Sequence, residues 1–330
     1  SDLTFNLKGN GNSFGALGTS ITPYLNITGT GNVAINGNST TGGNGIGGVI
    51  LNISTVNGSV NLNGTSNTGA GVNLGGASNL SGANVTINGN SNTGNGIILN
   101  GNADATNATI NGSSNTGTGT SIQGSANISG SNITGTSNGS GNGIFIGNGT
   151  ASNGSGANLS LNGSSVNRTG IFIGNGDREN LNATGSSTNG AGVNITGNVT
   201  NGTITGTTVN GTGALTSGTL INTTVNGNAT GNGSGVNVSG NITNGTITGN
   251  ASGNGSGVGI TGNTTLNNVT VNGSTANGSG VNISGNLSNS NGSTVTGNAT
   301  GDGNGVNISG NVTDGNISGN ATGNGSGVDP

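Results

Sequence analysis

Few side chains in this chain of 330 residues could act as acids, bases or metal ligands. It has no His and no Cys, and its formal net charge is −4. The acidic residues are Asp2, Asp104, Asp177, Glu179, Asp302, Asp314 and Asp329. General acid–base catalysis and metal catalysis need several such groups at one place. Most of these carboxylates are tens of residues apart, and Asp302 and Asp314 lie in sequences typical of polar turns. We therefore expect no enzyme activity, no metal site and no cofactor.

The most frequent pattern with chemical potential is Asn-x-Ser/Thr, the acceptor sequence of N-glycosylation. About two thirds of the Asn residues begin such a triplet, which is more than twice the chance frequency. The candidate glycan acceptors are Asn194, Asn237, Asn241, Asn282 and Asn307. The pattern also arises without modification, because residues two apart share one face of a strand and Asn-Gly-Ser/Thr favours turns. Both interpretations stay open.

These triplets belong to a repeat that runs through most of the chain. The segment 235–256, GVNVSGNITNGTITGNASGNGS, recurs with variations, and one residue after each run of small residues marks the register. The markers are Val49, Val72, Ile97, Thr120, Ile144, Ile171, Val193, Leu215, Val236, Val258, Val281, Val306 and Val328. Their mean spacing is about 23 residues. Such regular spacing indicates a repeat architecture and argues against a flexible Gly/Ser/Asn linker.

Each repeat reads as about three short strands separated by corners. The dominant residues, Gly, Asn, Ser and Thr, are poor helix formers. Apolar and polar residues alternate over short runs, and Gly or Asn-Gly after each run allows the positive φ of a sharp corner. Stacked repeats would superpose two sets of apolar residues: Val236, Val258, Val281 and Val306, and Ile204, Ile247 and Ile317. We therefore predict an all-β fold, a right-handed parallel β-helix (β-solenoid) of about 14 turns.

The domain organisation follows from the same repeat. Residues 1–45 are the least regular and are predicted to form irregular first coils, while residues 46–330 form the regular repeats of one continuous domain. The chain contains no Met, and no signal peptide is visible. We expect an internal fragment of a longer protein.

A second candidate site lies near the middle of the chain, where Ile-Phe-Ile-Gly-Asn-Gly occurs twice, one long turn apart. If the Ile residues point inward, Phe145 and Phe172 point outward and stack in adjacent turns. The densest cluster of charges lies beside them and is expected to form a solvated corner loop. Phe145, Phe172, Arg168 and Arg178 are thus a candidate surface contact patch. The alternative is ring stacking between turns with no further role.

The composition limits the kinds of binding partner that the chain could have. The chain has three basic residues and 2% aromatic residues, so nucleic acid is not expected as a partner. No apolar run approaches the length of about 18 residues that spans a bilayer, so no membrane insertion is expected. The absence of Cys excludes disulfides and thiolate metal sites.

The repeat resembles the shafts of two-partner-secretion exoproteins, such as filamentous haemagglutinin, high-molecular-weight adhesins and contact-dependent inhibition proteins. The likeness rests on GVNITGNVTNGTITG (192–206), GVNVSGNITNGTITG (235–249) and GVNISGNVTDGNISG (305–319). It implies a secreted or bacterial cell-surface location, an outer-membrane secretion partner and a role in adhesion, and in some members of that family hexoses occupy such sequons. The amino-terminal secretion motif of the family is not evident here.

The sequence leaves three hypotheses for the function of the chain. The first is a structural adhesin shaft whose polar faces contact a host-cell surface or carbohydrate weakly at many points. The second is an ice-binding β-solenoid, which needs Thr in register on every turn of one face. Asn, Ser, Thr and Gly interchange at outward positions, which argues against it. The third is a pure spacer or filament that carries a distal toxin or receptor-binding domain.

Overall fold

The structure is a computed structural model that describes residues 2–9, 24–147 and 158–330. These residues form β-strands and corners and contain no helix. The chain divides into two compact units, Ser1–Asn167 (unit 1) and Arg168–Pro330 (unit 2), which are described separately. Residues 10–23 of the segment predicted to be irregular lie outside the described residues.

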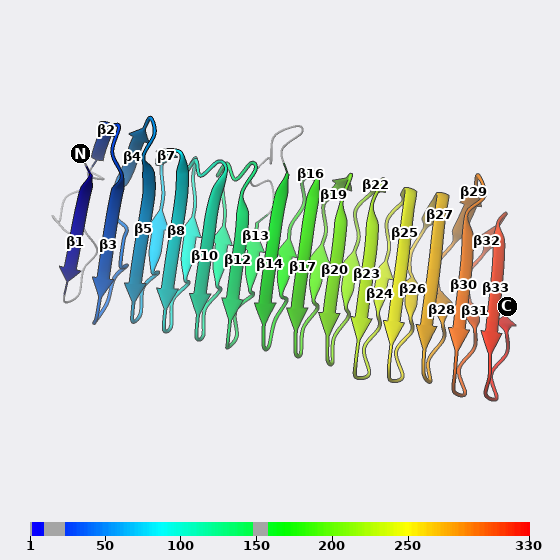
Figure 1. Cartoon of the computed structure of the whole chain (residues 1–330). Helices are drawn as coiled ribbons and strands as arrows, with labels where there is room; N and C mark the ends of the chain where they lie inside the picture. Colours follow the sequence, from blue (N-terminus) through cyan, green and yellow to red (C-terminus); the bar gives the residue numbers. More distant parts are fainter. Residues whose placement is uncertain (1, 10–23, 148–157) are drawn as a thin grey trace. The chain divides into compact units, whose positions relative to one another are not determined.

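Unit 1 contains three sets of strands, and the strands of each set follow one another side by side (Figure 1). The long strands are β1 (Leu3–Gly9), β3 (Val33–Ser39), β5 (Ser59–Ser66), β8 (Asn84–Ser91), β10 (Ala108–Ser114), β12 (Asn132–Ser137) and β14 (Leu159–Ser165). The short strands are β6 (Val72–Leu74), β9 (Ile97–Leu99), β11 (Thr120–Ile122) and β13 (Ile144–Ile146). A third set comprises β2 (Tyr24–Gly29), β4 (Ile50–Thr55) and β7 (Asn79–Ser81).

Unit 2 repeats this organisation. Its long strands are β17 (Leu181–Ser187), β20 (Thr203–Thr208), β23 (Thr224–Ala229), β25 (Ile242–Ala251), β27 (Thr264–Thr275), β30 (Thr294–Ala299) and β33 (Asn316–Ala321). Its short strands are β15 (Ile171–Ile173), β18 (Val193–Ile195), β21 (Ala214–Thr216), β24 (Val236–Val238), β26 (Val258–Ile260), β28 (Val281–Ile283), β31 (Val306–Ile308) and β34 (Val328–Asp329). Between them lie β16 (Asp177–Glu179), β19 (Asn198–Thr200), β22 (Leu220–Ile221), β29 (Leu287–Ser290) and β32 (Val312–Thr313).

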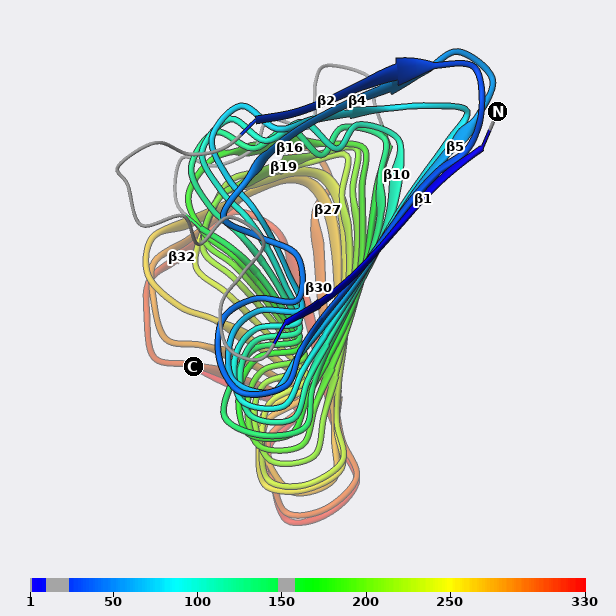
Figure 2. The same cartoon turned by 90° about the vertical axis from the view of Figure 1, so that its left-hand side faces the viewer.

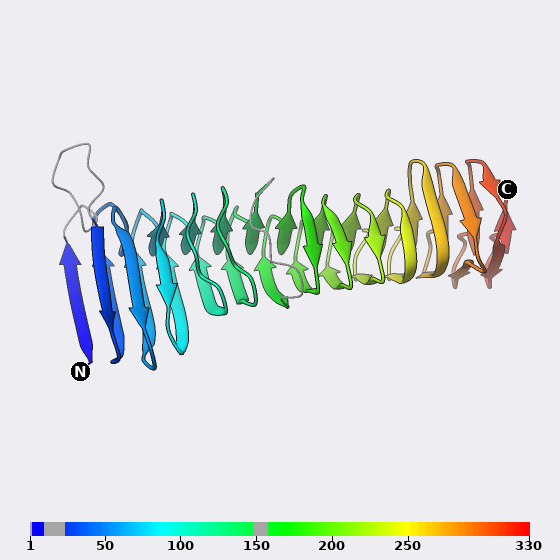
Figure 3. The same cartoon turned by 90° about the horizontal axis from the view of Figure 1, so that it is seen from above.

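The fold is a parallel β-solenoid, as the repeat predicts. Each strand pairs in parallel with the corresponding strand of the next turn, and within each unit successive turns lie over one another (Figures 2 and 3). The short strands number 12 over the two units, and Ile46 adds a bridge to Val72 before the first of them. The described chain therefore makes about 13 turns with the predicted spacing of about 23 residues.

The interior is built from columns of apolar side chains. Val236, Val258, Val281 and Val306 pair in register and are buried, as predicted. The second predicted column is also confirmed and contains Ile204, Val225, Ile247, Val271, Val295 and Ile317. Because each side chain of a column packs on the turns before and after it, one repeat cannot form a core alone.

Two of the predicted markers are wrong by a few residues. Ala214 rather than Leu215 takes the buried position between Val193 and Val236, and Leu215 faces outward. At the start of the repeats Ile46 rather than Val49 pairs with Val72. Ala214 and Ile46 each come directly after a buried glycine, and this position places their side chains in the apolar column.

That glycine marks the narrowest place of each turn. A Cβ atom added at Gly249 of β25 would lie less than 3.0 Å from the carbonyl oxygen of Gly257, which precedes β26. The same clash with a facing glycine occurs at Gly37, Gly64, Gly89, Gly112, Gly135, Gly185, Gly206, Gly227, Gly273, Gly297 and Gly319. The long strand and the segment before the next short strand thus touch backbone to backbone, and no side chain fits between them.

Buried hydroxyl groups close the corner after many of the long strands. Ser91 at the end of β8 accepts a hydrogen bond from the Gly94 amide at 2.9 Å and donates one to the Gly69 carbonyl of the preceding turn at 2.6 Å. Thr208 does the same with the Gly211 amide and the Gly190 carbonyl, at 3.0 and 2.7 Å. One side chain therefore satisfies backbone groups of two turns, which would otherwise be buried without partners.

The glycine contact yields a first prediction. Gly249→Ala should lower the free energy of unfolding by about 3 kcal/mol or more, because the new methyl group meets a backbone oxygen rather than a movable side chain. Thermal unfolding followed by circular dichroism measures the change. Gly29→Ala is the matched control, because nothing lies within 4 Å of its added Cβ. Equal melting temperatures for the two variants would contradict the close approach.

A second prediction concerns the buried threonines. Thr216 lies between Ile195 and Val238 in an apolar column, is 0% exposed, and its hydroxyl has no hydrogen-bond partner among the described residues. Thr216→Val should raise the free energy of unfolding by about 1–2 kcal/mol, because the desolvation penalty disappears.

Thr208→Val is the control for this substitution. It removes the same hydroxyl group, but one that makes two hydrogen bonds, so chemical denaturation should show a loss of stability. If both variants changed the free energy of unfolding in the same direction, the assignment of Thr216 as a hydroxyl without a partner would be contradicted.

Candidate functional site: a polar hollow between amide rows

An asparagine ladder runs along the outer face of β1, β3, β5, β8 and β10 in unit 1. The Nδ2 of Asn36 donates to the Oδ1 of Asn6, Asn63 donates to Asn36, and Asn88 donates to Asn63, each at 2.8 Å. Asn111 extends the row with a bond of 3.0 Å to Asn88. The parallel register repeats the same residue on each turn, so neighbouring amides meet in the orientation that lets each donate to the next.

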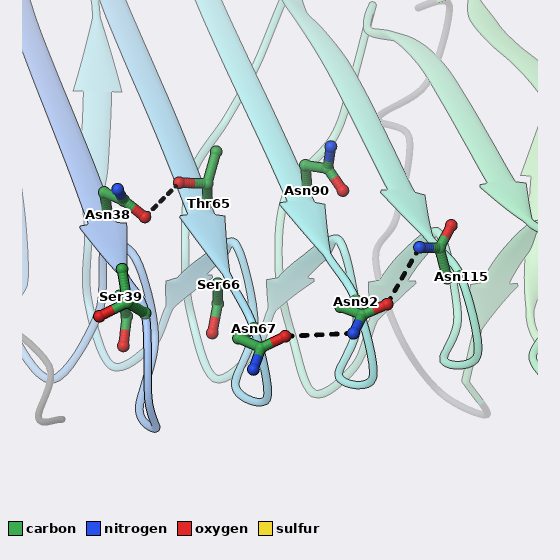
Figure 4. Close-up of a pocket in the computed structure, with 9 residues that line it drawn as sticks. Asn38, Ser39, Thr65, Ser66, Asn67, Asn90, Asn92 and Asn115 are labelled. Atoms are coloured by element: carbon green, nitrogen blue, oxygen red, sulfur yellow. Dashed lines mark hydrogen bonds between the residues drawn. The ribbon is translucent and has the colours of Figure 1, made fainter. Parts of the chain in front are cut away.

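A hollow of about 390 Å³ lies beside this ladder, where the long strands end (Figure 4). One row along it follows the strand ends and contains Asn38, Thr65 and Asn90. The other follows the corners and contains Asn67, Asn92 and Asn115. Ser39, Thr40 and Ser66 complete the lining.

Hydrogen bonds join two residues of the strand-end row and all three residues of the corner row. Thr65 Oγ1 donates to Asn38 Oδ1 at 2.9 Å. Asn92 donates to Asn67 at 3.1 Å, and Asn115 donates to Asn92 at 3.0 Å (Figure 4). Asn92 is held on both sides, so its amide is already oriented before any ligand arrives.

The chemistry of the hollow is that of neutral hydrogen bonding. All nine lining residues are Asn, Ser or Thr, so none is titratable. An amide carries two N–H donors and an oxygen with two lone pairs, and the ladder uses one donor and one lone pair of Asn92. A donor and an acceptor remain for a ligand. This set suits hydroxyl-rich, uncharged molecules better than phosphates or carboxylates, which favour cationic partners.

The predicted glycan acceptors differ in accessibility. Asn194, Asn237, Asn282 and Asn307 each occupy the middle of a three-residue strand and are half-buried. The Nδ2 of Asn307 donates to Asn282 at 2.8 Å, which occupies the atom that a glycan would modify. Asn241 is exposed, and its Oδ1 accepts from the Thr265 amide at 3.0 Å. Asn241 is thus the most open of the five candidates.

The predicted contact patch is only partly at the surface. Phe145 lies between buried Ile144 and Ile146 and is half-buried with its ring on the outer face, and Phe172 has the same setting in unit 2. Arg168 is exposed. Because the two Phe residues lie in different units, the stacking of their rings stays a prediction.

Arg178 contradicts the prediction of a solvated surface residue. It is 2% exposed, since β16 pairs with β19 in a register that places Arg178 beside Val199 on the inner side of the coil. Its guanidinium donates to the backbone carbonyl of Asp177 at 3.0 Å. Burial lowers the pKa of Arg178, and the Asp177 charge partly opposes this effect.

The part of the chain that the structure describes contains no cluster of metal-ligating residues. No group of three or more Asp or Glu residues there lies close enough together to hold a metal ion. Residues 2–9, 24–147 and 158–330 contain no helix that is long and apolar enough to cross a membrane.

Comparison with known proteins does not identify a family for this chain. Neither protein-family models, nor curated proteins, nor solved structures gave a match. The resemblance to exoprotein shafts therefore stays a prediction.

The sequence predicted the outward polar residues but not the hollow. The motif Ser-Asn-Thr-Gly at 66–69, 91–94 and 114–117 carried the signal, because it repeats at nearly constant spacing. Its Asn residues form the corner row of the hollow, and the buried Ser residues before them fix the corners.

The ladder yields a third prediction. Asn92→Ala should lower the free energy of unfolding by about 1–2 kcal/mol, because it removes two amide hydrogen bonds worth roughly 0.5–1.5 kcal/mol each. Asn61→Ala, on the outer face of β5, is the control, because no side-chain hydrogen bond of Asn61 occurs among the described residues. Urea unfolding of both variants measures the difference, and an equal loss would show that the ladder adds nothing.

Proposed function

We propose that this chain is a non-catalytic structural shaft of a secreted or cell-surface bacterial adhesin, which binds carbohydrate on host cells or other surfaces. The observation that carries the proposal is the hollow of unit 1. It presents oriented, uncharged amides and hydroxyls from successive turns. Sugar hydroxyl groups offer the complementary donors and acceptors.

Binding at such a surface is weak for each contact and gains strength by repetition. The hollow is open to solvent, and no aromatic or charged residue lines it, so a single sugar would bury little area. Several copies of the chain on one surface would act together, and linked sites raise the apparent affinity without new contacts. A repeated fold supplies this arrangement because each further turn adds another polar rung.

A fourth prediction tests this function. The purified chain, coupled at high density to beads, should bind a subset of neutral glycans on an array, whereas the free chain should bind weakly. Asn38→Val combined with Thr65→Val and Asn90→Val should abolish bead binding, because one row of the hollow loses its hydrogen-bonding groups. Val favours strands, so the long strands should persist.

The control variant carries three Val substitutions at polar positions of unit 2. Asn228→Val, Asn250→Val and Ser274→Val change residues on the outer face of β23, β25 and β27, and bead binding should be retained. A chain that binds neither glycans nor cells would support the alternative of a pure spacer or filament for a distal domain and would refute the adhesive role.

A further inference from the structure

The outer face of the long strands in unit 2 differs from that of unit 1. Strands β20, β23, β25, β27 and β30 run side by side in nearly the same direction (Figure 1). Their register aligns Thr203, Thr224, Thr246, Thr270 and Thr294 in one column. A second column, two residues further along each strand, contains Thr205, Asn226, Thr248, Asn272 and Thr296. We call these ten residues the threonine face.

The side chains of the threonine face are open to solvent. None of the ten is buried, and within the described residues none of them makes a side-chain hydrogen bond to the protein. In unit 1 the residues corresponding to the second column, such as Asn36, Asn63 and Asn88, consume much of their capacity in the ladder. The threonine face therefore offers hydroxyl groups that make no hydrogen bond to other described residues, whereas the ladder amides of unit 1 bond to one another.

The spacing of these groups is regular in two directions. Neighbouring strands lie about 4.8 Å apart, and alternate residues of one strand lie about 6.7 Å apart. Thr is β-branched and restricted at χ1, so its hydroxyl and methyl groups have few alternative positions. Oxygen positions on a prism face of ice repeat at similar distances in two perpendicular directions.

The surroundings of the threonine face favour ordered water. Residues 180–301 contain no Asp, Glu, Lys, Arg or His, so the five strands that form the face carry no charge that would reorient the water molecules on it. Methyl groups beside each hydroxyl limit the number of competing water positions. The fixed array would thus lose little side-chain entropy on contact with an ordered surface.

We infer that the threonine face orders water and binds ice. The sequence alone argued against this activity, because Asn, Ser, Thr and Gly interchange at outward positions. The register shows that the first column is Thr on five successive strands, while the second column alternates Thr with Asn. This inference is independent of the adhesive role, which rests on unit 1.

The test compares the intact chain with variants at the centre of the threonine face. Thermal hysteresis and inhibition of ice recrystallisation are expected for the unaltered chain. Thr246→Tyr and Thr270→Tyr, made separately, should each lose most of this activity, because a large ring lifts the face from the ice surface. Tyr favours strands, and circular dichroism checks the fold. Should one variant fail to fold, the other provides the same test.

Thr109→Tyr is the matched control, because Thr109 is exposed at the corresponding position of β10 in unit 1. It should keep full ice activity, while Thr246→Tyr should keep full glycan binding. An unaltered chain without thermal hysteresis and without recrystallisation inhibition would overturn the inference. Retained activity in the folded Tyr variants of unit 2, or an equal loss in Thr109→Tyr, would also overturn it.

Discussion

The close approach of two backbone segments in each turn is the constraint on which the rest of the structure depends. Gly249 and Gly257 meet with no room for a side chain, and equivalent pairs recur through both units. This contact makes the interior narrow, and among the described residues columns of Val, Ile, Leu and Ala fill it with no buried aromatic side chain. It also determines that the residue directly after the facing glycine points into the core. The high glycine content is thus a packing requirement of a thin coil rather than a sign of disorder.

Polar groups as well as apolar columns link successive turns. Ser91 and Thr208 link backbone groups of adjacent turns, and outer amides bond from rung to rung. A buried hydroxyl is tolerated where it completes such a link. Thr216 shows the opposite case, because its hydroxyl lies in an apolar column without a partner among the described residues. Cohesion between turns therefore depends on repetition of the same residue at the same position.

The same repetition produces two chemically different surfaces. In unit 1, amides on successive turns bond to one another and border a hollow suited to neutral, hydroxyl-rich ligands. In unit 2, the first column of the outer face is Thr, and its hydroxyls remain open to water. Thr248 stands between Asn226 and Asn272 in the second column of unit 2, so the amides of that column do not follow one another on successive turns and these described residues form no ladder. The adhesive and ice-binding proposals follow from this difference.

The sequence by itself determined the class of fold, the repeat length and most inward residues, because alternation and spacing are local properties of the chain. The tertiary structure decided which individual residues are buried and which surfaces form, because both depend on contacts between turns. Leu215 is larger than Ala214, yet the glycine contact places Ala214 in the core. The charge of Arg178 predicted exposure, yet pairing beside Val199 buries it. The hollow and the threonine face were likewise hidden, since each is assembled from residues more than 20 positions apart that only the register brings together.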